Sequence, residues 1–223
     1  MAKINNEAFV TLATTDNYAI GALTLAQSLK SLNTNRKLCI MITNDICESM
    51  RFVRLLIYCF LTRFFLFRTL INNVFDHVEI IDRLDSNDKV NLTLLKRPEL
   101  GVTFSKLHCW KLIQYEKCVF LDADCLAVKN VDDLFERDEF SAASDVGWPD
   151  CFNSGVFVFK PSLDTYSSLI TFASTEGSFD GGDQGLLNSY FKNWHLEESS
   201  KRLPFVYNMT TNVSYSYAPA FKQ

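Results

Sequence analysis

The strongest constraint on the fold is that short apolar runs alternate with stretches of helical spacing. Runs typical of buried strands cover residues 8–13, 37–43, 78–82, 118–121 and 155–159. Apolar residues recur at helical spacing through residues 18–32, and residues 163–173 are typical of an amphipathic helix. Strands that alternate with helices predict a mostly parallel sheet covered on both faces. Because neither a repeat nor a linker interrupts the chain, we expect one α/β domain over residues 1–223.

Charge, cysteine usage and hydropathy argue against several classes of protein. The formal net charge is -4 and there is no basic run, so we predict no nucleic-acid partner. The seven cysteines are scattered and never form a Cys-x-x-Cys pair, which favours a reducing compartment and a cytoplasmic location. Residues 52–68 are apolar on nearly every side, but three arginines interrupt them, so we predict no membrane span.

Two aspartates directly follow the predicted strand at residues 118–121. Asp122 and Asp124 are spaced i, i+2 after this apolar run. Ligands of open α/β sheets bind beyond the carboxyl ends of the strands, where two carboxylates can hold a divalent ion and, through it, a diphosphate. The alternative is an Asp-rich surface turn, because Asp-x-Asp occurs by chance in many chains.

A glycine-rich segment and a polar segment each have a functional and a purely structural interpretation. In residues 178–188, two glycines precede Asp183 and Gln184, which open a predicted helix. A carboxylate there suits a sugar ring, but spacing alone favours a glycine-rich turn with an Asp N-cap. Asn153 and Ser154 suit sugar hydroxyls and are also ordinary turn residues.

Basic residues and tyrosines give two further candidates. Arg97 and Lys106 suit a departing diphosphate, although most single Lys and Arg residues are simply solvated. Tyr215 and Tyr217 alternate with serine in a strip that ends at a proline. This pattern fits exposed tyrosines open to modification, and it equally fits an edge strand with amphipathic tyrosines.

Taken together, these segments resemble the glycogenins, a family of retaining glycosyltransferases with the GT-A fold. The resemblance extends over nearly the whole chain and is carried by the runs KRPELGVT (96–103), KLHCW (106–110), GWPDCFNSGVF (147–157) and GSFDGGDQG (177–185). It implies a Rossmann-like GT-A domain that moves glucose from UDP-glucose onto its own tyrosine, with Mn²⁺ as the metal. It further implies extension to a short α-1,4-glucan that primes glycogen, a homodimer, and glycogen synthase as a partner.

The resemblance assigns the nucleotide and metal side of the site. By similarity Asp122 and Asp124 bind Mn²⁺, and Ala123 lies along the nucleotide. The remaining positions that match donor-binding residues of the family are Leu12, Thr14, Thr15, Tyr18, Arg97 and Lys106. Thr15 stands where the family usually has Asn, which puts one hydrogen bond to the nucleotide in doubt.

The sugar and acceptor side follows in the same way. Positions that match residues around the glucose are Asn153, Ser154, Asp180, Asp183 and Gln184. The resemblance implies that Lys106 and the metal stabilise the departing UDP. Asp183 is implied either to form a covalent intermediate or to stabilise the developing positive charge. Tyr215 matches the tyrosine that receives the first glucose, and Tyr217 is the nearby alternative.

Two departures from the family pattern carry expectations of their own. The family continues past the run matched at residues 215–222 to a segment that supplies a third metal ligand, so we expect a more weakly held metal and a C-terminally incomplete domain. Residues 52–68 have no counterpart in the family, and we interpret them as an insertion from an unspliced intron or a gene-model error.

Three functional hypotheses remain open from the sequence. The first is an active self-glucosylating transferase. The second is an inactive fragment that only binds a nucleotide sugar or pairs with an intact subunit. The third keeps the enzyme but gives it a separate glycan as acceptor.

Overall fold

The computed structural model describes residues 6–44, 46, 71–86, 88, 98–197 and 199–211. Three predictions lie outside these residues: the insertion at 52–68, the donor contact of Arg97, and the acceptor role of Tyr215 or Tyr217. Within the described residues, no helix is both long and apolar enough to cross a membrane.

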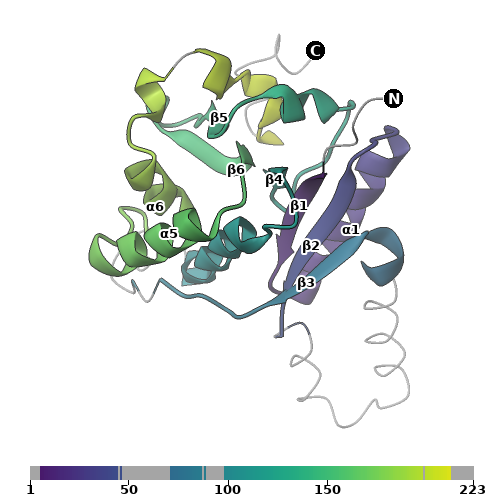
Figure 1. The fold of residues 1–223 in the computed structure, drawn as a ribbon, viewed down its shortest axis with the longest axis horizontal. Coiled ribbons are helices and arrows are strands. Elements are labelled where there is room, and N and C mark those ends of the chain that lie inside the picture. The colour runs from purple at the N-terminus through teal and green to yellow at the C-terminus, as the bar shows by residue number, and fades with distance from the viewer. Residues whose placement is uncertain are drawn as a thin grey trace.

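A single seven-stranded sheet organises the domain, with the strand order β3-β2-β1-β4-β6-β5-β7 (Figure 1). The strands are β1 (Glu7–Ala13), β2 (Lys37–Thr43), β3 (His77–Ile81), β4 (Lys117–Leu121), β5 (Ser141–Ser144), β6 (Phe152–Phe159) and β7 (Arg202–Leu203). Strand β6 runs antiparallel to β4 and β5, and the other neighbouring pairs are parallel. The prediction of an α/β fold with a mostly parallel sheet is therefore confirmed.

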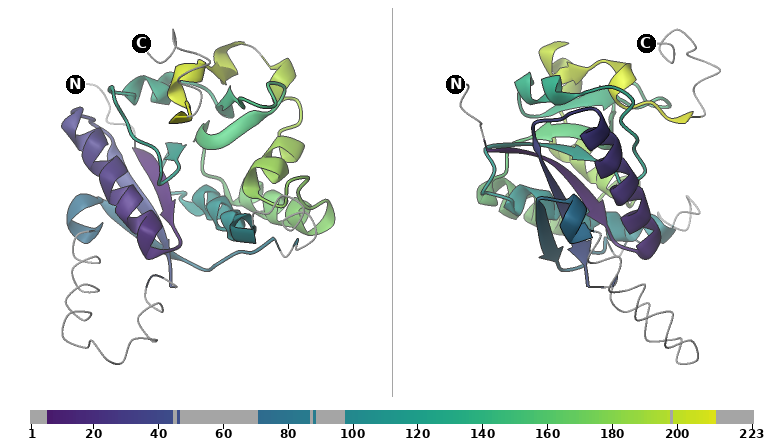
Figure 2. Two further views of the ribbon diagram at one scale, coloured as in Figure 1. Left: turned by 180° about the vertical axis from the view of Figure 1, so that it is seen from behind. Right: turned by 90° about the vertical axis from the view of Figure 1, so that its right-hand side faces the viewer.

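Helices cover both faces of the sheet. The α-helices are α1 (Asp16–Ser31), α5 (Leu163–Thr175) and α6 (Asp183–Tyr190). The 3-10 helices are η1 (Pro98–Lys111), η2 (Asp132–Glu136), η3 (Trp194–Leu196), η4 (Ser199–Lys201) and η5 (Phe205–Tyr207). Helix α1 packs on one face, and η1, α5 and α6 pack on the other (Figures 1 and 2).

The strands alternate their side chains between two hydrophobic cores. In β4, Cys118 and Phe120 enter the core beneath η1, α5 and α6, whereas Val119 and Leu121 enter the core beneath α1. This alternation follows from the two-residue repeat of a strand, and both sets are buried because the sheet is covered on both sides. The first core is rich in stacked rings, with Trp110 packed on the ring of Phe157.

The strand directions bring several loops to one edge of the sheet. The parallel strands β1, β4 and β5 all end at this edge, and the antiparallel strand β6 begins there. The segments that follow β1 and β4 therefore lie at the same end as the β5–β6 connection. This is the edge at which ligands of open α/β sheets bind.

Three details differ from the sequence-based expectations. Strand β6 begins at Phe152, so Asn153 and Ser154 belong to a strand instead of a turn. Strands β5 and β7 were not predicted, because Ser141–Ser144 consists of small residues with weak strand preference and β7 has two residues. Asp183 is the first residue of α6, as predicted, but the N-cap of this helix is Gly182, so the alternative of an Asp N-cap is not what the structure has.

Candidate functional site

A buried lysine holds two of the predicted site carboxylates together. The Nζ of Lys106 lies 2.7 Å from Oδ2 of Asp183 and 3.0 Å from Oδ1 of Asp122. It also donates to the carbonyl oxygen of Ser154 at 3.1 Å. These three residues come from η1, α6 and the end of β4, and we call Lys106, Asp122 and Asp183 the charge cluster. Segments that lie far apart in the sequence therefore converge on one lysine.

Packing explains why the ammonium group lies where it does. The Lys106 side chain is only 4% exposed, and its Nζ lies 4.9 Å from the centroid of the Phe120 ring. The three ammonium hydrogens match three acceptors, so the buried charge is both paired and hydrogen-bonded. In this arrangement Lys106 orients the two carboxylates and offsets their charge.

Both burial and neighbouring charges shift the pKa values of Lys106 and Asp122. Burial alone lowers the pKa of Lys106, but the carboxylates of Asp122 and Asp183 outweigh it and hold that pKa above its ordinary value. Burial raises the pKa of Asp122 to about 6, with the Asp183 charge adding to the rise and Lys106 opposing it. Such a perturbed group at the ligand-binding edge of a sheet is typical of a functional site.

The second predicted metal ligand lies on the same loop and faces outward. Asp124 is exposed, whereas the side chain of Asp122 is 37% exposed beside Lys106. Asp122 and Asp183 share one ammonium group, and the charge of Asp124 acts on Asp122 from the same loop, which leaves excess negative charge in this region. Hard oxygen donors with excess negative charge suit Mg²⁺ or Mn²⁺. Among the described residues, no group of three or more His, Cys, Asp or Glu side chains is arranged to hold a metal.

A fourth aspartate, Asp145, which the sequence analysis did not select, connects several site residues. Oδ2 of Asp145 accepts hydrogen bonds from Asn153 Nδ2 and Gln184 Nε2, both at 3.1 Å. Its Oδ1 accepts from the backbone N–H groups of Gly147 at 2.8 Å and Trp148 at 3.2 Å. Burial raises the pKa of Asp145, but these four donors outweigh it and lower that pKa below its usual value.

Asp145 escaped detection because the strand before it was not predicted. Its position after β5 is equivalent to that of Asp122 after β4, and the strand order would have indicated it. Asn188 was missed as well. It bonds to both backbone groups of Phe152, with its Oδ1 accepting from N and its Nδ2 donating to O, each at 2.9 Å. This pairing fixes the start of β6 against α6.

The loop before α6 is organised by Asp180. Its Oδ1 accepts from the Ser178 hydroxyl at 2.7 Å and from the N–H groups of Gly182 at 2.9 Å and Gly185 at 3.0 Å. A Cβ atom on Gly185 would lie 2.4 Å from this oxygen, so glycine is needed for the approach. Asp180 thus satisfies donors at the start of α6, where Gly182 has no capping side chain.

Asp183 and Gln184 are fixed by neighbours on other elements. The Ser154 hydroxyl donates to Oδ2 of Asp183 at 2.8 Å, and the Asp183 N–H donates to Thr103 Oγ1 at 3.0 Å. The Ser154 N–H donates to Oε1 of Gln184 at 3.2 Å. With Asp145 as the link to Asn153, four of the five predicted glucose residues therefore form one connected set of hydrogen bonds across β6 and α6: Asn153, Ser154, Asp183 and Gln184.

The predicted first loop lies at the start of α1. Thr15 is the N-cap of this helix, and its side chain accepts a hydrogen bond from the Tyr18 N–H at 3.4 Å. Leu12 is half-buried and Thr14 is buried at the end of β1. A Cβ atom on Gly21 would lie 2.4 Å from the Ala123 carbonyl oxygen, so this glycine lets α1 approach the Asp122–Asp124 loop.

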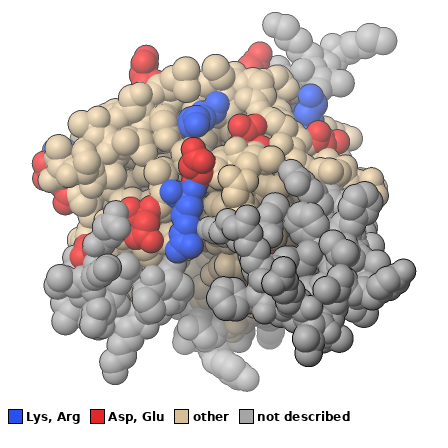
Figure 3. Space-filling model, turned by 90° about the horizontal axis from the view of Figure 1, so that it is seen from below, with Lys and Arg blue, Asp and Glu red and all other residues tan. Residues whose placement is uncertain are grey.

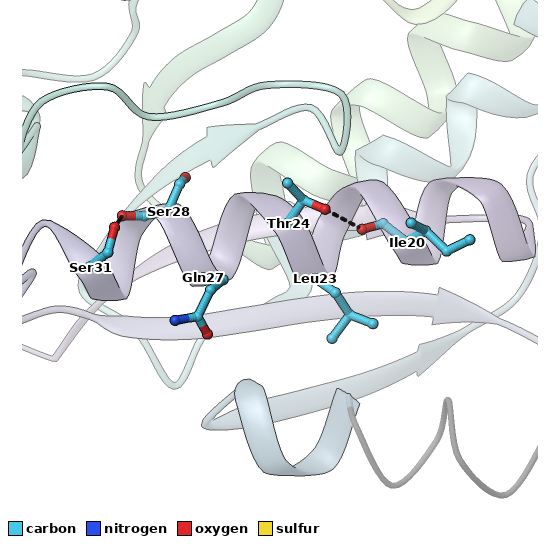
Figure 4. A pocket seen from close by; sticks show the side chains of 6 residues that line it. All are labelled: Ile20, Leu23, Thr24, Gln27, Ser28 and Ser31. Atoms are coloured by element: carbon cyan, nitrogen blue, oxygen red, sulfur yellow. Dashed lines mark hydrogen bonds between the residues drawn. The ribbon is translucent and has the colours of Figure 1, made fainter.

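An open depression lies on the outer face of α1, away from these residues. It has a volume of about 440 Å³ and is lined by Ile20, Leu23, Thr24, Gln27, Ser28 and Ser31 (Figure 4). None of these six side chains is ionisable. Seen from below, the described surface mixes acidic and basic side chains without a large patch of one sign (Figure 3).

The comparison with protein families agrees with this geometry. The model of glycosyl transferase family 8 matches residues 9–222, and so includes the whole charge cluster. The chain belongs to glycosyl transferase family 8.

Curated relatives within this family are glycogenins. The chain is 53% identical to glycogenin-1 of Mus musculus over 219 residues, which cover 98% of this chain and 61% of the relative. It is 52% identical to glycogenin-2 of Homo sapiens over 99% of this chain and 40% of that protein. The family 8 chain therefore spans about three-fifths or less of the length of these two relatives.

Solved structures support the fold assignment. The glycosyltransferase GlyE of Streptococcus pneumoniae TIGR4 has a TM-score of 0.57 at 20% identity, over 98% of this chain and 50% of that one. The galactosyltransferase LgtC, solved with donor and acceptor sugar analogs, has a TM-score of 0.51 at 16% identity, over 82% and 70%. At these identities the likeness shows that the family 8 chain shares the fold of these glycosyltransferases.

Proposed function

We propose that this chain transfers glucose from UDP-glucose to its own Tyr215 and then extends a short α-1,4-glucan, as a primer of glycogen. The observation that carries the proposal is the charge cluster, in which a buried lysine holds two carboxylates at the carboxyl edge of the sheet. The family 8 match and the 53% identity to a glycogenin support the choice of reaction.

The bonds exchanged define what the site has to do. The bond between the anomeric carbon of glucose and the diphosphate oxygen breaks, and a bond from that carbon to the tyrosine oxygen forms. The hydroxyl proton passes to the released diphosphate. Asp183 supplies negative charge opposite the positive charge that develops on the sugar, and Ser154 and Lys106 hold that carboxylate in place.

The Asp122–Asp124 loop fits a divalent ion, which we propose to be Mn²⁺. The fit rests on two hard carboxylates spaced i, i+2 with excess negative charge around them. Bound there, the ion would offset the charge of the departing diphosphate. Two protein carboxylates would leave coordination positions open for diphosphate oxygens.

We extend the proposal to the setting in which the reaction takes place. A cytoplasmic location, a homodimer and an interaction with glycogen synthase are supported by the resemblance to the glycogenins and by the cysteine pattern. Burial raises the pKa of the Cys39 thiol to about 12, which keeps this thiol protonated.

The mass of the intact protein tests the transfer reaction directly. The purified chain is incubated with UDP-glucose and MnCl₂, and its mass is followed over time. We expect increments of one hexose that peptide mapping assigns to Tyr215. A Tyr215→Phe variant should lose them, and a shift of the label to Tyr217 would reassign the acceptor.

Two other outcomes separate the competing hypotheses. Binding of UDP-glucose by calorimetry without any mass increment would reduce the chain to a nucleotide-sugar binder. In the second outcome, the Tyr215→Phe variant transfers glucose to an added glycan at the wild-type rate, and neither protein labels itself. A separate glycan would then be the acceptor.

A further inference from the structure

Two aromatic side chains that are exposed to solvent stack on each other. Trp148 is 66% exposed and Phe179 is 51% exposed, with ring centroids 6.3 Å apart and ring planes within 9° of parallel. All other Trp and Phe side chains among the described residues are buried or half-buried. Exposed apolar surface of this kind is costly in water and marks sites of interaction. We call Trp148 and Phe179 the aromatic pair.

The loop that carries Trp148 is held in a fixed shape. Its N–H donates to Asp145, and its carbonyl accepts a hydrogen bond from the Cys151 N–H at 2.8 Å, which closes a turn. Pro149 occupies the second position of that turn, where its fixed φ angle is favourable. The exposed ring is therefore presented by an ordered backbone.

The loop that carries Phe179 is held just as firmly. The Ser178 hydroxyl bonds to Asp180 and, at 2.7 Å, to the Gly182 carbonyl oxygen. Gly181 adopts a φ of 72°, which glycine tolerates without strain. Because both loops are ordered before any ligand arrives, binding to the aromatic pair costs little conformational entropy.

The aromatic pair is tied to the charge cluster by the carboxylates that order its loops. Asp145 binds the Trp148 backbone with one oxygen and Gln184 with the other. Asp180 binds the backbone of Gly182, the residue directly before Asp183. A molecule resting on the aromatic pair would therefore extend from the residues that we assign to the glucose.

The position of the pair favours a sugar over a nucleotide. Thr14 and Thr15 follow β1, whereas the Trp148 loop joins β5 to β6, and β4 lies between β1 and β6. The predicted nucleotide loop and the aromatic pair are thus on opposite sides of Asp122. A protein partner is disfavoured too, because a stable interface buries about 800 Å² on each side, far more than two side chains offer.

We propose that the aromatic pair is a binding platform for a pyranose ring of the acceptor, an α-1,4-linked glucan. The apolar C–H face of the sugar packs on the electron-rich ring faces, and its hydroxyl groups point to the polar rim. The inference rests on the proposed function, because it is the growing product that this platform would hold.

Binding without any donor isolates the platform from the transfer reaction. Maltoheptaose is titrated into the protein and followed by NMR. We expect Trp148→Ala and Phe179→Ala each to raise the Kd about tenfold, which is the scale of one aromatic contact. Trp148→Phe should keep most of the affinity. Leu196→Ala, at a side chain that is 74% exposed in η3, is the matched control and should leave the Kd unchanged.

The length of the product gives a second readout. The first glucose joins a tyrosine that carries no glucan, so Trp148→Ala should retain the first mass increment and stop the series early. A Trp148→Ala product as long as the wild-type one would overturn the platform. Unchanged maltoheptaose affinity in Trp148→Ala would overturn it as well. The same holds if Trp148→Ala loses affinity for UDP measured without any glucan, or if it changes its oligomeric state.

The two proposals fail in different ways. If the wild-type protein binds maltoheptaose through the aromatic pair but gains no hexose, the platform stands and the transfer proposal is wrong. If hexoses are added and Trp148→Ala changes neither affinity nor product length, the transfer proposal stands and the platform is wrong.

Discussion

Asp122 and Asp145 follow neighbouring parts of one sheet edge, yet their surroundings shift their pKa values in opposite directions. Burial raises the pKa of Asp122 to about 6 even though Lys106 lies 3.0 Å away. Four N–H donors outweigh burial at Asp145 and lower its pKa. The difference shows that the balance between burial and bonded partners sets the direction of each pKa shift.

The same division separates Asp183 from Asp180. Asp183 is paired with Lys106 in the charge cluster, and Asp180 is bonded to a hydroxyl and to backbone N–H groups of its own loop. The site thus contains carboxylates whose partner is a cation and carboxylates whose partners are neutral donors. Removing the cation should therefore affect stability differently from crowding or neutralising a carboxylate that neutral donors hold.

Removing the cation should have the largest effect on stability. Lys106→Met leaves Asp122 and Asp183 facing each other without compensation, and an uncompensated buried charge costs about 3–5 kcal/mol. Urea unfolding at pH 7 measures the loss. The double variant Lys106→Met/Asp183→Asn should recover a large part of it, and equal losses in both variants would contradict the role of charge.

Crowding the anchor at Asp180 should have the next largest effect. The Cβ atom of a Gly185→Ala variant would lie 2.4 Å from Asp180 Oδ1, and forced overpacking typically costs about 1–3 kcal/mol. This should outweigh the gain of up to about 1 kcal/mol that alanine offers in a helix. Ser189→Ala on the same helix is the control. A Gly185→Ala protein more stable than the wild type would show that the Asp180 loop shifts to accept the added methyl group without cost.

Neutralising Asp145 should destabilise the protein by about 1–2 kcal/mol. An asparagine there loses the charge-assisted hydrogen bonds. Its NH₂ group would face either the backbone N–H donors or the side-chain amide donors, and neither pair can accept a hydrogen bond from it. Thermal unfolding measures the change. An Asp145→Asn protein as stable as the wild type would mean that its four hydrogen bonds are replaced by water at no cost.

Acid should reveal the smallest effect, again at Asp145. Its folded-state pKa lies below the value of about 3.9 for an unfolded carboxyl group, so its contribution is fully present above pH 4. The contribution is lost as the pH falls from about 4 through the folded-state pKa. The unfolding free energy of Asp145→Asn should therefore fall less steeply than that of the wild type between pH 5 and pH 3. Parallel curves would contradict the assignment.

Local pattern was sufficient for much of the fold. The apolar runs at β1, β2 and β4 predicted these strands within a residue or so. The strand β5 was missed, because Ser141–Ser144 is buried by its neighbours and not by its own composition. The anchoring roles of Asp145 and Asn188 were missed with it.

The sequence alone determined that Asp122 and Asp183 belong to the carboxyl edge, because one follows an apolar strand and the other opens a helix, and both signals are local. It placed Asp122 after β4 and Asp183 at the start of α6 without any knowledge of their partners. Only the tertiary structure decided that Lys106 lies between these carboxylates and that Trp148 stacks on Phe179. Such contacts join segments far apart in the chain, and they depend on how η1, β6 and α6 pack on the sheet, which no periodicity within one segment encodes.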